Sequence, residues 1–268
     1  MADGWRKWWP TIEASAQHVS ELLVELAGVQ NNHKVLDVAT GIGEPAVTAA
    51  GKVGSGGQVI ATDQSAGMLA IARERAAQAG LDNIEFREVD GEALNLPDES
   101  FDAVLCRWGL MFMPNVAGAI KGFRDLLVPG GKFATAVWGV PADVPALSMP
   151  MGVIKAVLNP PPPPAEAPTL FKLGTPGLLD QAFMDGGLTV TGTESTIVEF
   201  NFKSSQDYVS FLQEIASPII ALVGQPPVDK QAKVWEGIKD SAEKFAKPDG
   251  TISIPNVCLV MTGVRNWS

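Results

Sequence analysis

Apolar residues recur every three or four positions from Thr11 onward, which predicts an amphipathic helix that ends near Gly28. The next apolar stretch, KVLDVA at 34–39, is short and continuous, as in a buried strand. Gly41 and Gly43 follow it directly, and Pro45 suits the first turn of another helix. The chain therefore begins with a helix followed by a strand, a glycine turn and a second helix.

The same alternation continues through the first half of the chain. The apolar pattern predicts further strands at 58–63, 83–90, 101–108 and 132–138, with helices at 65–80 and 115–127. Strands that alternate with helices, and that are almost continuously apolar, indicate a parallel sheet covered by helices on both faces.

The pattern changes after Trp138, because Pro141, Pro145, Pro150 and the run at 160–164 are expected to break any regular element there. A short helix is predicted around 176–185. Beyond it the sequence predicts a long strand at 188–202, helices at 206–223 and 228–246, and a last strand near 257–264. The two helices lie between the final two strands, so we expect them to fold back as a lid over the carboxyl edge of the sheet.

Composition narrows the class of protein. The 268 residues carry a net charge of −10, which argues against a nucleic-acid partner. Two cysteines and two histidines predict neither a disulfide framework nor a metal site. The first residues lack the apolar stretch of a signal peptide, and no run of 18 apolar residues occurs. We therefore expect a cytoplasmic protein with no integral membrane association.

The glycine turn predicts a nucleoside site. Gly41-Ile42-Gly43-Glu44-Pro45-Ala46 fits the pattern Gly-x-Gly-x-x-Ala, and Asp63 follows Gly43 by 63 − 43 = 20 residues. Glycines permit close backbone approach to a ligand, and a carboxylate at the end of the second strand can accept hydrogen bonds from both ribose hydroxyls. Both a dinucleotide and another nucleoside would satisfy this pattern.

Asp37 separates these two possibilities. A carboxylate just before the turn would repel the pyrophosphate of a dinucleotide, and Glu44 adds to that repulsion. The turn has no lysine or arginine to offset it. The Asp37 carboxylate suits a ligand that carries an ammonium and a sulfonium, as S-adenosylmethionine does.

These motifs resemble those of a known enzyme family. VLDVATGIGEPA and VIATDQSAGML look like the first two motifs of class I S-adenosylmethionine-dependent methyltransferases. REVDGEALNLPDESFDAVLCRWGLMFM and LLVPGGKF resemble the later motifs of the UbiE-like branch, also called methyltransferase type 11. The resemblance covers roughly residues 30–140, and residues 141–256 follow no motif of the family.

The resemblance implies an α/β fold: a Rossmann-like, doubly wound, seven-stranded and mostly parallel sheet whose last strand is antiparallel. We expect a single domain over 1–268. Its core would comprise 30–140, 188–202 and 257–265, and an α-helical lid would comprise 1–28, 141–187 and 203–250.

The resemblance also assigns roles to single residues. Asp37 would lie near the methionine amino group, and the backbone of Thr40, Gly41 and Gly43 would line the methionine and ribose. Asp63 would bind the ribose hydroxyls. The remaining cofactor candidates are Gln64, Met68, Asp90, Gly91 and Glu92 around the adenine, and Arg107 near the cofactor carboxylate.

The methyl acceptor leaves a weaker signal. Three tryptophans, Trp8, Trp9 and Trp108, are candidates for its binding site, and the first two stand where the family often has an aromatic segment with a tyrosine. His18 is the candidate general base, because an imidazole titrates near neutral pH. Met111, Phe112 and Met113 are expected to belong to the core.

The prediction is S-adenosylmethionine-dependent methyl transfer, with S-adenosylhomocysteine as product, to an oxygen or an activated carbon of a small, largely apolar molecule. Two alternatives stay open: a non-catalytic S-adenosylmethionine-binding protein, and a nicotinamide-dependent oxidoreductase. The sequence leaves the acceptor and the oligomeric state undetermined.

Overall fold

The computed structural model describes residues 2–162, 164 and 169–267. The chain forms two compact units that interleave along the sequence. Unit 1 comprises 1–16, 140–167 and 197–257, and unit 2 comprises 17–139, 168–196 and 258–268. The first helix, α1 (Ala2–Leu26), contributes its beginning to unit 1 and the rest to unit 2.

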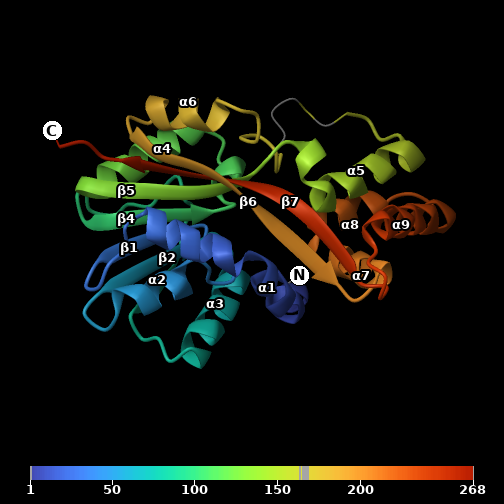
Figure 1. The fold of residues 1–268 in the computed structure, drawn as a ribbon, viewed down its shortest axis with the longest axis horizontal. Helices are drawn as coiled ribbons and strands as arrows, with labels where there is room; N and C mark the ends of the chain where they lie inside the picture. The colour runs from blue at the N-terminus through green and yellow to red at the C-terminus, as the bar shows by residue number, and fades with distance from the viewer. Residues whose placement is uncertain (1, 163, 165–168, 268) are drawn as a thin grey trace. The chain divides into compact units, whose positions relative to one another are not determined.

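Most of the sheet lies in unit 2 (Figure 1). The described residues form one seven-stranded sheet of order β3-β2-β1-β4-β5-β7-β6. The first five strands pair in parallel, whereas β7 runs antiparallel to β5, with Trp138 opposite Cys258. The strands are β1 (Lys34–Val38), β2 (Gln58–Asp63), β3 (Ile84–Glu88), β4 (Phe101–Arg107), β5 (Leu127–Trp138), β6 (Thr189–Phe202) and β7 (Ile252–Val264). The predicted fold class is confirmed.

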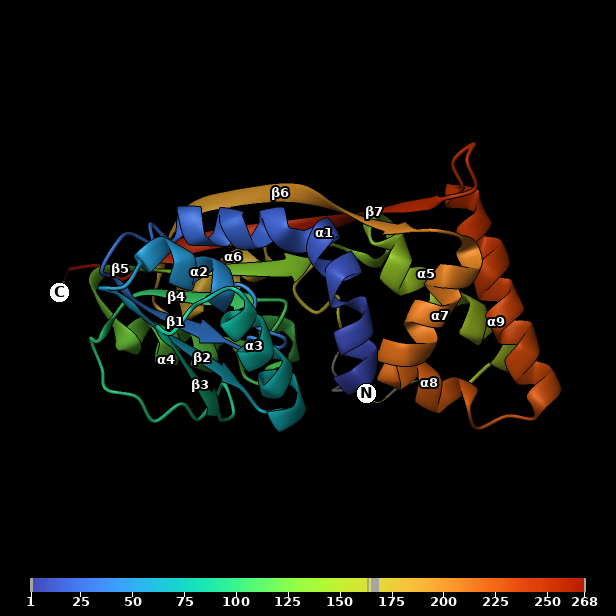
Figure 2. The same ribbon diagram turned by 90° about the horizontal axis from the view of Figure 1, so that it is seen from below.

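Helices cover both faces of the parallel strands. α2 (Ala46–Val53) and α3 (Ala66–Gln78) lie on one face, and α4 (Val116–Leu126) and α6 (Leu178–Asp185) lie on the other (Figures 1 and 2). Ser65 and Asn115 cap α3 and α4, because each side chain accepts a backbone N–H of the first turn. These caps fix the start of each helix at the carboxyl edge of the sheet.

Unit 1 has an aromatic core of its own. It contains α5 (Pro145–Leu158), α7 (Ser205–Ile215), α8 (Ser217–Val223) and α9 (Val228–Ala242). Trp8 packs edge-on against Phe211 with ring centroids 5.4 Å apart, and Phe202 packs against Tyr208 at 5.2 Å. Three short 3₁₀ turns complete the described elements: η1 (Leu110–Phe112), η2 (Pro141–Asp143) and η3 (Glu243–Phe245).

The prediction that prolines prevent regular structure after Trp138 is wrong. α5 begins at Pro145, where a proline has no hydrogen bond to lose, and continues through Pro150. Pro150 cannot donate to the carbonyl of Ala146, four residues earlier. The hydroxyl of Tyr208 donates to that carbonyl instead, at 2.6 Å. A tertiary contact therefore satisfies the carbonyl that the proline leaves free.

Other element boundaries differ from the sequence prediction in instructive ways. α1 begins before Thr11 and includes Pro10, and the predicted helix at 206–223 is two helices, with Pro218 at the start of the second. Of the segments expected as a lid, α5 and α7–α9 belong to unit 1, while α6 belongs to unit 2. The lid role stays a prediction, and the proline run at 160–164 lies partly outside the described residues.

Candidate functional site

The glycine turn connects β1 to α2 at the carboxyl edge of the sheet. Gly41 and Gly43 have φ values of +57° and +105°, a region that glycine adopts without strain. A Cβ on Gly43 would lie 3.2 Å from the Cβ of Ala72, so the turn is closely packed on α3. Thr40 N–H donates to the carbonyl of Thr62, which ties the turn to β2.

Asp63 joins this turn to the start of α3. One carboxylate oxygen accepts the Gly41 N–H and the other accepts the Ser65 N–H, both at 2.9 Å. The side chain remains half-exposed. The two backbone donors fix its orientation while it stays accessible to a ligand.

A pocket of about 450 Å³ opens beside Asp63 at this edge. It combines three carboxylates with an apolar wall, and within the described residues its lining includes no lysine or arginine. The lining residues are Ala39, Asp63, Gln64, Asp90, Gly91, Glu92, Trp108, Gly109, Phe112, Met113 and Pro114. Such a site suits a ligand without phosphates and with an apolar or cationic part.

Two glycines bring the walls of the pocket together. A Cβ on Gly91 would lie 2.9 Å from the Met113 Cε, and a Cβ on Gly109 would lie 2.6 Å from the Ala39 Cβ. Ala39 and Trp108 also have left-handed backbones, with φ of +57° and +58°. A bulky residue rarely adopts that conformation outside a functional or strained segment.

Asp37 is fully buried beneath the turn. One of its carboxylate oxygens accepts the Ala46 N–H at 3.0 Å, while Oδ1 has no hydrogen bond of ordinary geometry within the described residues. Burial raises the pKa of Asp37 to about 7, against the lowering effects of the nearby Thr40 hydroxyl and Arg107. A cation bound above Asp37 would stabilise its ionised form, so this group fits an ammonium or sulfonium ligand.

Arg107 ends β4 and points toward α1. Its Nη1 donates to the Ser20 hydroxyl at 2.7 Å, and its guanidinium lies 4.9 Å from the Trp108 ring centroid. Trp108 in turn stacks on Trp138, with centroids 4.4 Å apart. Desolvation lowers the pKa of Arg107, although the nearby Glu44 and Asp37 carboxylates oppose that effect.

Arg75 is a buried support of the glycine turn that the sequence did not reveal. Its Nη1 donates to the Ile42 carbonyl at 2.7 Å, and its Nη2 lies 3.5 Å from Glu44. Glu44 also accepts the Thr48 hydroxyl, which accepts from Gln17. An arginine within a helical pattern gives no sign of this role, because the partner lies 33 residues away.

The structure brings many of the predicted site residues together. Asp63, Gln64, Asp90, Gly91, Glu92 and Trp108 line the pocket. Asp37 and Thr40 are buried under the turn, and Gly41 and Gly43 form it. Met68 donates its N–H to the Ser65 hydroxyl nearby, while neither Met68 nor Arg107 is a lining residue.

The remaining candidates lie on α1. Trp8 is buried among aromatic rings of unit 1, and its indole N–H donates to Glu214. Trp9 is half-buried and His18 is exposed. Their predicted roles in acceptor binding and catalysis stay predictions.

Sequence reasoning missed part of the apolar wall. Met111 is buried in the core as expected, but Phe112 is 50% exposed and lines the pocket with Met113. Periodicity could not separate Met111 from Phe112, because both belong to a single 3₁₀ turn, η1.

Comparison with known proteins identifies the parallel core. Residues 35–131 match the methyltransferase domain family. This stretch is similar to the methyltransferase domain of the UbiE C-methyltransferases. The ubiquinone/menaquinone biosynthesis C-methyltransferase UbiE of Cellvibrio japonicus is 36% identical over 119 residues, which is 44% of this chain and 48% of that protein. The chain thus spans about half the length of the curated relatives it matches.

Solved structures share the fold of the methyltransferase domain. The YcgJ protein of Bacillus subtilis has a TM-score of 0.60 and 18% identity, with 94% of this chain and 100% of that chain covered. Phosphoethanolamine N-methyltransferase 2 of Haemonchus contortus, crystallised with S-adenosyl-L-methionine, has a TM-score of 0.58 and 17% identity, with 96% and 56% covered. At these identities the likeness concerns the fold.

Proposed function

We propose that this protein is an S-adenosylmethionine-dependent methyltransferase that acts on an oxygen or an activated carbon of a small, largely apolar molecule. The observation that carries the proposal is the pocket at the carboxyl edge, where Asp63 lies beside the glycine turn and faces no basic side chain of the lining. The methyltransferase domain match over residues 35–131 supports it.

The cofactor would span the pocket along the turn. Asp63 would accept the ribose hydroxyls, and Gln64, Asp90, Gly91 and Glu92 would surround the adenine. Asp37 lies beneath the turn, where its carboxylate would attract the methionine ammonium. When bound, S-adenosylmethionine supplies an electrophilic methyl group on a sulfonium.

The chain's own contribution to such a transfer is alignment and exclusion of water. Phe112, Met113 and Pro114 offer the apolar wall against which an acceptor can be held. The rigid backbone contacts of Asp63 keep the ribose site aligned with that wall. An acceptor that is already nucleophilic needs no protein base.

Calorimetry with S-adenosylmethionine, S-adenosylhomocysteine and NADH tests the cofactor assignment. We expect micromolar affinity for the first two ligands and none for NADH, because a pyrophosphate would meet the Asp37 and Glu44 carboxylates. Binding of NADH alone would favour the oxidoreductase instead. Binding of S-adenosylmethionine without methyl transfer to any member of an acceptor panel would favour a non-catalytic binder.

His18 is the proposed base for acceptors that must lose a proton. His18→Ala should lower turnover while the affinity for S-adenosylmethionine stays unchanged. His33→Ala, which alters a histidine ahead of β1, provides the control. Equal turnover in His18→Ala and the unmodified protein would remove His18 from the mechanism.

The partner and location follow as proposals from the same reasoning. None of the helices in the described part of the chain combines the length and apolar character that a membrane span requires. The net charge of −10 disfavours nucleic acid. We propose a small-molecule acceptor and a cytoplasmic location.

A further inference from the structure

The apolar wall of the pocket is an irregular segment that the sheet does not hold. Phe112 ends η1, and Met113 and Pro114 lie between η1 and the start of α4. Within the described residues, the N–H groups of Phe112 and Met113 bond to carbonyls of the same short segment, those of Gly109 and Leu110. A segment with so few backbone bonds depends on side chains from elsewhere to keep its position.

Lys172 provides such a contact from a distant part of the chain. Its ammonium donates to the Met113 carbonyl at 2.8 Å and to the Pro114 carbonyl at 3.2 Å. These two carbonyls follow η1, where no helix continues to supply donors. A charged donor shared between two carbonyls fixes the position of the wall and leaves the apolar side chains free to face the pocket.

The turn at residues 171–174, which carries Lys172, is closely packed. Gly174 N–H bonds to the Phe171 carbonyl, and Leu173 is buried. A Cβ on Gly174 would lie 2.4 Å from the Gly139 carbonyl oxygen and 2.7 Å from that of Trp138. The turn therefore packs directly on the end of β5, which gives Lys172 a rigid base.

A second contact joins the wall to the loop that carries Glu92. The Glu92 carboxylate accepts the Asn115 N–H at 3.0 Å, and Met113 lies against Gly91. The wall thus contacts both Lys172 and the loop that carries Asp90, Gly91 and Glu92, the residues proposed to surround the adenine. Displacement of Met113 would open that part of the pocket.

We propose that Lys172 is a positioning residue, which holds the Met113–Pro114 wall against the adenine-side loop and thereby preorganises the pocket for the nucleoside. The identity of the ligand in this inference rests on the proposed function. The anchoring of the wall by Lys172 does not depend on that function. Lys172 is not a lining residue, so it acts through the two carbonyls rather than by touching the ligand.

The test compares Lys172→Met, Lys172→Arg and the control Lys52→Met, which alters an exposed lysine of α2. Hydrogen exchange of peptides that cover residues 109–115 measures, without any ligand, how firmly this segment is held. We expect faster exchange there in Lys172→Met, with the peptides of β1 and β2 unchanged. Lys172→Arg keeps a cationic donor and should restore slow exchange.

Calorimetry with S-adenosylhomocysteine measures how the loss of this anchor changes the affinity of the pocket. Lys172→Met should bind about five- to tenfold more weakly, and Lys172→Arg should recover most of the affinity. The loss should persist at 0.5 M salt, because it arises from hydrogen bonds at contact distance. A long-range effect of the lysine charge would be screened at that salt concentration.

The outcomes separate the two proposals. If the unmodified protein binds no S-adenosylhomocysteine, the proposed function fails, and exchange at 109–115 still decides whether Lys172 anchors the wall. If the unmodified protein binds and Lys172→Met shows unchanged exchange and unchanged affinity, the positioning role is overturned. A loss of affinity that disappears at high salt would overturn it as well.

Discussion

The two edges of the parallel sheet in unit 2 are built differently. At the carboxyl edge, Ala39 and Trp108 have left-handed backbones, and buried oxygens of Asp37 and Thr40 have no hydrogen bond of ordinary geometry within the described residues. At the amino edge, the Arg265 guanidinium donates to the carbonyls of Leu127 at 2.7 Å and Asp125 at 3.0 Å.

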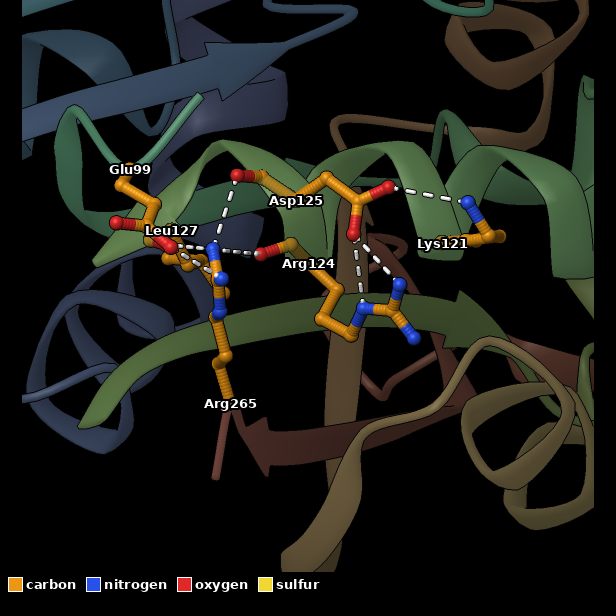
Figure 3. Close-up of polar contacts among 6 residues, drawn as sticks. All are labelled: Glu99, Lys121, Arg124, Asp125, Leu127 and Arg265. Carbon is orange, nitrogen blue, oxygen red and sulfur yellow. Dashed lines mark hydrogen bonds and ion pairs between the residues drawn. The ribbon is translucent and has the colours of Figure 1, made fainter. Parts of the chain in front are cut away.

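Figure 3 shows how these contacts converge at the amino edge. Arg265 follows β7 and also pairs with Glu99 at 2.6 Å. Asp125, at the end of α4, accepts from Arg124 and from Lys121. The end of α4, the beginning of β5 and Arg265, which directly follows β7, are thereby joined by charge-assisted hydrogen bonds.

The difference between the two edges points to the carboxyl edge as the place where a ligand binds. Charge-assisted contacts at the amino edge stabilise the fold, although Glu99 there also has a left-handed backbone. At the carboxyl edge, the left-handed Ala39 and Trp108 line the pocket, and the buried oxygens without partners lie in the adjoining turn and at the end of β1. Local rules of structure are most often violated where a protein binds or reacts. Four substitutions test this contrast.

The largest effect is expected at Asp37. The raised pKa of about 7 means that its contribution to stability is present in full near pH 4 and is lost as the pH rises to 7. Without ligand, Asp37→Asn should therefore be more stable than the unmodified protein above pH 7, by on the order of 4 kcal/mol. Urea unfolding at pH 5 to 8 measures this difference.

The same substitution should weaken S-adenosylmethionine binding. An asparagine cannot supply the negative charge that attracts the ammonium, so affinity in the unmodified protein should rise with pH through 7 and stay flat in Asp37→Asn. Parallel pH profiles of the two proteins would contradict the assignment of Asp37.

Asp63→Ala tests the ribose site directly. It removes a carboxylate proposed to accept hydrogen bonds from the ligand, so binding should weaken by about 2–4 kcal/mol. Asp102 is a matched control, because its carboxylate accepts the Lys34 N–H at the amino edge, at 2.7 Å. Calorimetry should show near-normal affinity in Asp102→Ala, and equal losses in both variants would refute a special role for Asp63.

Arg265→Ala should lower stability rather than ligand affinity, the opposite of what is expected for Asp63→Ala. The loss of its bonds to backbone carbonyls and Glu99 should lower the free energy of unfolding by about 2–3 kcal/mol, while ligand affinity stays near normal in the folded protein. Lys121→Ala, which removes an exposed ion pair, should cost about 0–1 kcal/mol. Denaturant titration measures the free energy of unfolding of each variant, and calorimetry measures its ligand affinity.

The smallest effect is expected at Ala39. Glycine removes the strain of the left-handed backbone but also makes the unfolded chain more flexible, so Ala39→Gly should change stability by less than about 0.5 kcal/mol. Ala70→Gly, at an exposed position within α3, should cost about 1 kcal/mol. A loss at Ala39 as large as that at Ala70 would show that the backbone there is unstrained.

Several features of the site were predictable because they depend on neighbours in the sequence. The apolar run at 34–38, the glycines after it and Asp63 at the end of the next strand suffice to place a nucleoside pocket at one edge of a parallel sheet. Parallel strands bring their carboxyl ends together, so no long-range information was needed to group Asp37 with Asp63.

Other features depend on partners that no local pattern reveals. α5 continues through Pro150 while Tyr208, 62 residues away from Ala146, satisfies the freed carbonyl. Met111 and Phe112 are neighbours in one 3₁₀ turn, yet one is buried and the other lines the pocket. Packing against the rest of the fold decides which side chain faces inward.

The sequence alone thus determined the order of strands and helices from β1 to β5, the glycine turn and the carboxylates beside it, since hydrophobic periodicity and turn chemistry act over a few residues. Tertiary structure decided the raised pKa of Asp37, the hydrogen bond from Arg75 to the turn and the hydrogen bond from Lys172 to the Met113 carbonyl. Burial and long-range hydrogen bonds set these properties, and both arise only when distant segments pack together.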